Sequence, residues 1–300
     1  MTPFRGLSAF PITPADACGR VDTEALGRLL ERLHAAGVDS IGLLGSTGGY
    51  MYLTLDERRR AIAAAARSVG GRTPLMVGVG ALRTDEAETL ARDAASEGAD
   101  ALLLAPVSYT PLSEEEVYQH FATVAQATDL PLCVYNNPGT THFTFSDALL
   151  ERLAAVPNIK AVKMPLPKDI DVKGELGRLR QDIPDDFAVG YSGDWRAADA
   201  LLAGADAWYR VVGGLLPEPA LKLVRAAGAR DIAEVRRIDG HFQPLWELFK
   251  EFGSIRVIYT AASILSLCEA VPPRPILPLT DANRVRVTTA LDALAGLMQR

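Results

Sequence analysis

The strongest constraint on the fold is a regular alternation of short apolar runs with longer amphipathic stretches. Apolar runs fall at 6–12, 40–44, 74–79, 101–105, 132–135, 159–163, 187–191 and 207–212. Helical periodicity lies between them, for example over 23–36, 55–69, 85–97 and 114–128. Short buried strands separated by helices are typical of a parallel sheet with right-handed crossovers. Eight such units are the number that closes a barrel, so we predict an α/β fold, a (β/α)8 TIM barrel.

Capping residues mark the starts of the predicted helices. Five side chains that can accept a hydrogen bond from the first helical turn each precede an apolar-periodic run: Asp22, Thr54, Thr84, Ser113 and Ser146. Ser113 followed by Glu116 also fits a capping box. A doubly wound open sheet is the alternative architecture. It is disfavoured because no glycine-rich dinucleotide fingerprint follows the first strand.

The end of the chain carries helical periodicity only. These stretches cover 232–252, 255–269 and 282–298, and a proline-rich segment at 272–275 interrupts them. We therefore predict a barrel domain over residues 1–228 and a C-terminal helical extension over 229–300 that packs on the barrel.

Composition excludes several classes of function. The chain is 48% hydrophobic and has a net charge of −6 with no basic block, which argues against nucleic acid as a partner. Three widely spaced cysteines form neither a disulfide framework nor a zinc pattern, and no segment reaches membrane-spanning length. The four histidines have no carboxylate at ligand spacing, so we expect no metal, although His142 follows a strand end and could line a pocket. We predict a cytoplasmic enzyme with no membrane partner.

Barrel enzymes place catalytic groups where strands end, and Lys163 ends the sixth apolar run. Strand alternation puts Ile159, Ala161 and Lys163 on one face. If that face points into the barrel, desolvation lowers the pKa of the amine and frees the neutral nucleophile that imine formation requires. The alternative is a lysine at a strand end that reaches solvent.

Two further strand ends support the first interpretation. Tyr135 ends the preceding strand, where a phenol can carry protons for an imine-forming lysine, although it can equally be an aromatic cap on the core. The turn over 45–49 includes Ser46, Thr47 and Gly48, whose N–H and hydroxyl groups can hold a carboxylate. An ordinary turn is the alternative.

These motifs together resemble the dihydrodipicolinate synthase / N-acetylneuraminate lyase family. The resemblance runs from about Gly6 to Leu279 and includes the turn at 45–48, the segment 135–138, Lys163 and the segment 192–194. It implies that Lys163 forms a Schiff base with pyruvate or another 2-oxo acid, with Tyr135 as proton carrier. Ser46 and Thr47 would bind the substrate carboxylate. It also implies a homo-oligomer, either a dimer or a tetramer, and no dissociable cofactor.

The sequence departs from dihydrodipicolinate synthases at several positions. Ser108 stands where those synthases usually have a second tyrosine that completes a proton relay across a dimer, and Tyr109 is a candidate to replace it. Thr140 stands where they have an arginine that holds the carboxylate of the aldehyde substrate. The eighth strand contains Tyr209 and Arg210. Arg210 could supply the missing charge at the pocket, or it could point outward and pair with an acidic helix residue.

Four functions follow. The first is a class I aldolase or lyase acting on pyruvate or another 2-oxo acid, with a substrate other than aspartate semialdehyde. The second is dihydrodipicolinate synthase itself, in lysine biosynthesis. A dehydratase or deaminase using the same lysine is third, and a non-catalytic binding barrel is fourth.

Overall fold

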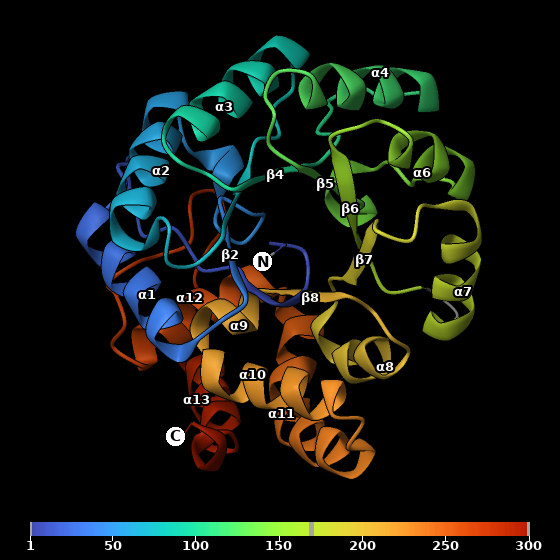
Figure 1. Ribbon diagram of the computed structural model, residues 1–300. Helices are drawn as coiled ribbons and strands as arrows, with labels where there is room; N and C mark the ends of the chain where they lie inside the picture. The colour runs from blue at the N-terminus through green and yellow to red at the C-terminus, as the bar shows by residue number, and fades with distance from the viewer. Residues whose placement is uncertain (1, 168–170, 299–300) are drawn as a thin grey trace.

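A closed barrel of eight parallel strands forms the centre of the molecule, and the strands follow one another in chain order (Figure 1). This computed structural model describes residues 2–167 and 171–298. The strands are β1 (Gly6–Ala9), β2 (Ser40–Leu43), β3 (Leu75–Gly78), β4 (Ala101–Leu104), β5 (Leu132–Tyr135), β6 (Ile159–Met164), β7 (Ala188–Tyr191) and β8 (Ala207–Arg210). Strand β8 pairs with β1 and closes the barrel. The predicted TIM barrel is confirmed.

Helices surround the strands. They are α1 (Thr23–Ala36), α2 (Leu55–Val69), α3 (Thr84–Ser96), α4 (Glu114–Ala125), α5 (Pro138–Thr141), α6 (Asp147–Ala154), α7 (Val172–Asp182), α8 (Ala197–Leu202), α9 (Val211–Leu215) and α10 (Pro217–Gly228). The last three α-helices are α11 (Ile232–Phe252), α12 (Ser254–Ile264) and α13 (Asp281–Asp292). Short 3-10 helices are η1 (Tyr50–Tyr52), η2 (Asp194–Arg196) and η3 (Ala295–Leu297).

The C-terminal helices pack on one side of the barrel. Helix α11 contacts α8 and α10, α12 contacts α9, and α13 contacts both α11 and α12. In Figure 1, α11 and α13 lie outside α10. The domain boundary between 228 and 229 stays a prediction.

Several predicted boundaries were wrong. The runs at 6–12 and 207–212 are longer than the strands they contain, because the chain leaves β1 after Ala9 and begins α9 at Val211. The predicted helix at 255–269 is α12, which ends at Ile264. Thr84 is no cap: Arg83 holds that position, and the Thr84 hydroxyl lies 2.9 Å from His120 Nδ1.

The other predicted caps are confirmed. The side chains of Asp22, Thr54, Ser113 and Ser146 each accept a hydrogen bond from a backbone N–H in the first turn of the helix that follows. Ser113 and Glu116 form both bonds of a capping box. Such caps satisfy N–H groups that a helix start otherwise leaves unpaired.

Two groups of buried side chains separate the inside of the barrel from the layer between strands and helices. The interior group includes Phe4, Phe10, Met76, Leu103, Tyr135 and Tyr209, and the outer group contains most of the remaining apolar residues. The N-terminus lies at the centre of the ring in Figure 1, and Phe4 packs into this end of the interior. The opposite end of the interior is therefore the open one.

A bulge corrects the predicted facing of the sixth strand. Leu132 pairs with Ile159 and Cys133 with Ala161, so the register shifts at this point. Ile159 consequently belongs to the outer group, while Ala161 lies inside the barrel. The prediction that Ile159 shares a face with Ala161 and Lys163 was wrong because simple alternation does not anticipate a bulge.

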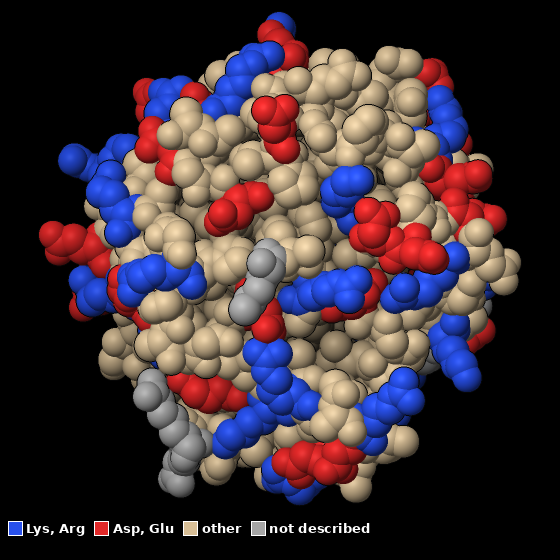
Figure 2. Space-filling model, in the orientation of Figure 1, with Lys and Arg blue, Asp and Glu red and all other residues tan. Residues whose placement is uncertain are grey.

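The surface is charged without a block of one sign on the face shown. In Figure 2, Lys and Arg side chains are interspersed with Asp and Glu around the rim. No helix within the described residues is both long and apolar enough to cross a membrane.

Candidate active site

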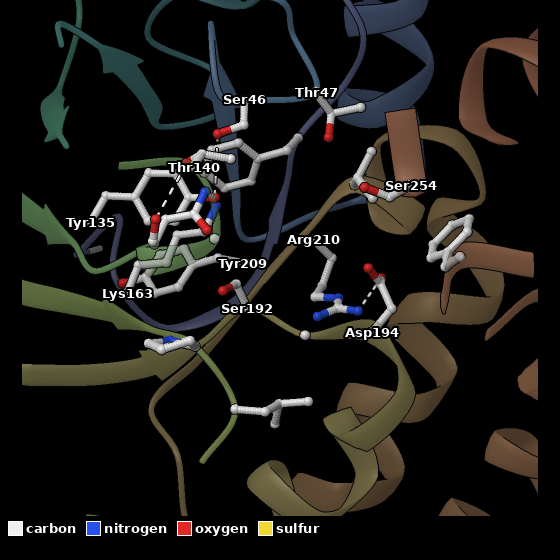
Figure 3. A pocket seen from close by; sticks show the side chains of 18 of the residues that line it. Ser46, Thr47, Tyr135, Thr140, Lys163, Ser192, Asp194, Tyr209, Arg210 and Ser254 are labelled. Atoms are coloured by element: carbon white, nitrogen blue, oxygen red, sulfur yellow. Dashed lines mark hydrogen bonds and ion pairs between the residues drawn. The ribbon is translucent and has the colours of Figure 1, made fainter. Parts of the chain in front are cut away.

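A cavity of about 540 Å³ opens at the end of the barrel where the strands finish. One half, which we call the lysine side, is lined by Phe10, Ser46, Tyr135, Thr140, Lys163 and Tyr209. The other half, the arginine side, is lined by Asp194, Trp195, Arg210, Phe249 and Ser254. In Figure 3, Lys163 and Tyr135 lie on one side and Arg210 and Asp194 on the other, with Ser192 between them. The carboxyl end of the strands is where barrel enzymes hold their active sites.

Lys163 is the buried amine of the lysine side. It lies opposite Tyr135 in the pairing of β5 with β6, and only 5% of the residue is exposed. Its Nζ is 3.9 Å from the ring centroid of Phe10 and 4.1 Å from that of Tyr135. Burial lowers the pKa of this amine from 10.5 to about 7, and the positive charge of Arg210 acts in the same direction. A large fraction of the amine is therefore neutral near pH 7.

Tyr135 contributes a phenol next to this amine. Its oxygen accepts a hydrogen bond of 3.0 Å from Asn137 Nδ2 and one of 3.5 Å from the Ser46 hydroxyl. Burial raises the pKa of the phenol, so it is protonated at neutral pH. Because both neighbours donate to the oxygen, the phenolic hydrogen remains available to a molecule in the cavity.

Two aromatic rings form the floor beneath Lys163, and each depends on glycine. A Cβ on Gly42 would lie 2.2 Å from the ring of Phe10, and one on Gly45 would lie 2.6 Å from it. A Cβ on Gly190 would lie 2.4 Å from the ring of Tyr209. The Tyr209 hydroxyl is 3.9 Å from the Cys133 sulfur, deep inside the barrel. The amine therefore stands on a packed apolar base that excludes water.

The turn after β2 brings Ser46 and Thr47 to the cavity. Leu44 adopts a left-handed conformation with φ of 56°, which turns the chain sharply at the end of the strand. Ser46 and Thr47 are half-buried and line the cavity. Gly48 does not line it: with Gly49, it lines a separate pocket beside the 272–274 segment.

The arginine side is built around a buried ion pair. The guanidinium of Arg210, at the end of β8, contacts the Asp194 carboxylate at the start of η2. Its Cζ lies 4.7 Å from the ring centroid of Trp208 and 6.0 Å from that of Trp246. Burial lowers the pKa of this guanidinium well below its ordinary value. The sequence left open whether Arg210 lines the pocket or points outward to an acidic partner. In the structure it lines the cavity and also pairs with the acidic Asp194.

Some predicted residues do not reach the cavity. Ser108 bonds locally with Thr110, and Tyr109 is 97% exposed. His142 does not line the cavity either. Thr140 does line it, although it is exposed. Within the described parts of the chain, no cluster of three or more His, Cys, Asp or Glu could hold a metal ion.

Sequence reasoning missed several lining residues. Phe10 lies within the predicted run 6–12 and Asn137 within the segment 135–138, but neither was assigned to the cavity. The period-2 pattern at Phe10 could have placed its ring inside the barrel. Trp195, Phe249 and Ser254 belong to η2 and to the α11–α12 junction. Their approach to the barrel mouth depends on tertiary packing, which no local pattern reveals.

The (β/α)8 barrel carries a buried amine of lowered pKa next to a phenol at its open end, and its relatives are class I aldolase-type lyases, the class to which this chain belongs. The chain belongs to the dihydrodipicolinate synthetase family, whose model matches residues 3–294. The family agrees with the resemblance that the sequence motifs indicated.

Individual relatives extend over nearly the whole chain. A 4-hydroxy-tetrahydrodipicolinate synthase from Corynebacterium aurimucosum is 37% identical over 91% of this chain and 87% of its own length. One from Neisseria meningitidis serogroup B is 32% identical over 95% of this chain and 97% of its own length. Among solved structures, a dihydrodipicolinate synthase from Agrobacterium tumefaciens is 68% identical, with a TM-score of 0.97 and coverage of 98% of this chain and 99% of that one.

Proposed function

We propose that Lys163 condenses with pyruvate or a related 2-oxo acid, and that the resulting imine lets the enzyme make or break a carbon–carbon bond. The observation that carries this proposal is the position of the Lys163 amine, which is buried, has a pKa lowered to about 7 and lies 4.1 Å from the Tyr135 ring centroid. A neutral amine is required to attack a carbonyl, and a nearby acid is required to remove its oxygen.

The chemistry follows from these two side chains. The nitrogen of Lys163 adds to the carbonyl carbon of the oxo acid and gives a carbinolamine. Tyr135 transfers its proton to the hydroxyl group, which leaves as water and produces the imine. The phenolate of Tyr135 then takes a proton from the adjacent carbon, which gives an enamine. The enamine carbon attacks an aldehyde, whose oxygen takes that proton. Ser46, which donates to the Tyr135 oxygen, is placed to exchange protons with the phenol.

The relatives favour one particular reaction. The curated relatives described above are named 4-hydroxy-tetrahydrodipicolinate synthase, and these names support that activity over the substrate other than aspartate semialdehyde that the sequence first suggested. A related structure from Acinetobacter baumannii, 29% identical with a TM-score of 0.89 and coverage of 98% of this chain and 99% of that one, is described as a complex with pyruvate. We therefore propose pyruvate as the first substrate and the synthase reaction as the first to test.

One observation favours a second candidate function. Thr140 lines the cavity, and no arginine of the described chain lies on the lysine side. An aldolase, or a dehydratase, acting on another 2-oxo acid would use the same lysine with a different partner molecule.

The assembly and its location are also proposals. Tyr109, Tyr52 and Met51 are exposed, at 97%, 44% and 44%, and an interface between copies would cover such side chains. We propose a homo-oligomer, a dimer or a tetramer, in the cytoplasm, acting on a small molecule and without a dissociable cofactor.

Borohydride trapping tests the mechanism directly. Wild-type protein is incubated with pyruvate, reduced with borohydride, and examined by intact and peptide mass spectrometry. We expect one stable adduct, located on Lys163. A second assay follows consumption of aspartate semialdehyde in the presence of pyruvate. No adduct with any 2-oxo acid would contradict the proposal, and an adduct without consumption would favour the second candidate.

A further inference from the structure

Arg210 is an unusual residue to find at the wall of this cavity. The residue is only 1% exposed, yet it lines the cavity together with Asp194. Among the described residues that line it, Lys163 and Arg210 are the cations and Asp194 is the anion. Once Lys163 is occupied by an imine, Arg210 is the cation of this set that remains for a second molecule.

Burial of a guanidinium is costly unless its charge and its N–H groups find partners. Asp194 contacts one end of the group, through Nη2. Nε is buried and, within the described part of the chain, has no hydrogen-bond partner. A guanidinium carries five N–H donors in a planar fork. The contact with Asp194 therefore leaves part of that fork unused.

The guanidinium is held in place by its surroundings. The rings of Trp208 and Trp246 contact the guanidinium on one side, and Asp194 of η2 contacts it on another. These contacts restrict the orientation of the side chain. In Figure 3 the group projects from the end of β8 toward the space between Ser192 and Asp194. A planar fork held in this way matches a carboxylate, which it can bind through two parallel hydrogen bonds.

We propose that Arg210 binds a second carboxylate of the substrate, one that lies beyond the carbon attached to Lys163. This inference rests on the proposed function, because it assumes that the 2-oxo group is held as an imine at Lys163. It assigns the arginine side of the cavity to selection of a carboxylate-bearing partner, either a separate aldehyde or the far end of a longer 2-oxo acid. Asp194 is the internal counter-ion with which that carboxylate competes.

Matched 2-oxo acids test this inference without knowledge of the natural substrate. The probes are 2-oxoadipate and 2-oxopimelate, compared with 2-oxohexanoate and 2-oxoheptanoate, which have the same chain lengths but no second carboxylate. The measurement is the concentration of each acid that gives half-maximal borohydride adduct. A charge-assisted pair leads us to expect about a tenfold preference for at least one dicarboxylate in wild-type protein.

Three variants assign the preference to Arg210. Arg210→Met retains an apolar stem for the tryptophan rings and should abolish the preference, while trapping of pyruvate remains measurable. Asp194→Asn removes the competing carboxylate and should maintain or increase the preference. The control is Arg196→Met. Arg196 lies in η2, the 3-10 helix that also contains Asp194, but it pairs with Asp199 at 2.8 Å and does not line the cavity. It should behave as wild type.

The outcomes separate this inference from the proposed function. If pyruvate gives no adduct, the proposed function fails. If pyruvate gives an adduct and wild-type protein does not distinguish either matched pair, the assignment of Arg210 is wrong, whatever the variants do. A preference that survives in Arg210→Met, or that is lost in Asp194→Asn, also contradicts it.

Discussion

The lysine side and the arginine side of the cavity are built in different ways. The lysine side consists mainly of strand ends and the turn after β2, with an amine on a packed aromatic floor. The arginine side is assembled from η2, the end of β8 and the α11–α12 junction. One half is therefore fixed by the barrel, and the other depends on loops and on the C-terminal helices.

A barrel divided in this way can retain its chemistry and change its substrate. Imine formation needs only the amine, the phenol and a site from which water is excluded, and the strand ends supply all three. Selection of the partner molecule falls to segments that can vary without disturbing the barrel. Substitutions on the two sides should accordingly have effects of different kinds.

The largest expected effect belongs to Lys163. Lys163→Met removes the nucleophile and should reduce turnover by more than about 10⁴-fold. No borohydride adduct should form with pyruvate. An adduct on another lysine would contradict the assignment of imine formation to the lysine side of the cavity.

The same variant should be more stable than wild type, and the difference should depend on pH. The pKa of Lys163 falls from 10.5 to about 7 on folding, so between these values the unfolded chain holds a proton that the folded chain lacks. Wild-type stability therefore rises with pH across this range, and below it the full cost of burying the charge remains. Thermal melting should show a larger gain for Lys163→Met at pH 6 than at pH 9.

Tyr135→Phe should have the next largest effect. The ring and its packing remain, but the proton carrier is lost, so turnover should fall by about a hundredfold or more. The melting temperature should change little. If trapping with pyruvate proceeds at the wild-type rate in this variant, another group carries the proton and the role assigned to the phenol is wrong.

The pH dependence of trapping comes third. With a pKa of about 7, the neutral fraction of Lys163 increases by about tenfold between pH 6 and pH 8, and initial trapping rates at low pyruvate should increase to match. An amine of ordinary pKa would still be gaining tenfold per unit at pH 9, whereas this one should have reached a plateau.

The smallest effect should come from the arginine side. Trp195 is 40% exposed and lines the cavity, so Trp195→Ala should change stability little. It should raise KM for the second substrate several-fold, on the order of one apolar contact, and leave pyruvate trapping unchanged. A fall in kcat with unchanged KM would contradict the assignment of chemistry to the lysine side and of substrate selection to the arginine side.

The sequence predicts the lysine side better than the arginine side for a physical reason. Tyr135 ends β5 and Lys163 lies one residue before the end of β6. Strand ends in a barrel meet at one rim, so recognition of the apolar runs is enough to bring the two together. The bulge at Leu132 and the left-handed turn at Leu44 are local deviations that periodicity does not contain. Trp195 and Ser254 are distant in sequence from the lysine and reach the cavity only because α11 and α12 pack where they do.

The glycines beneath the amine have a consequence for engineering and for divergence within the family. Phe10 occupies the volume that side chains on Gly42 and Gly45 would fill, and Tyr209 does the same at Gly190. A related barrel with a side chain at any of these three positions could not accept the facing ring by a single exchange, because the Cβ would overlap it. Ancestral intermediates with only one half of such an exchange would carry either a void or a clash, so these positions should change together.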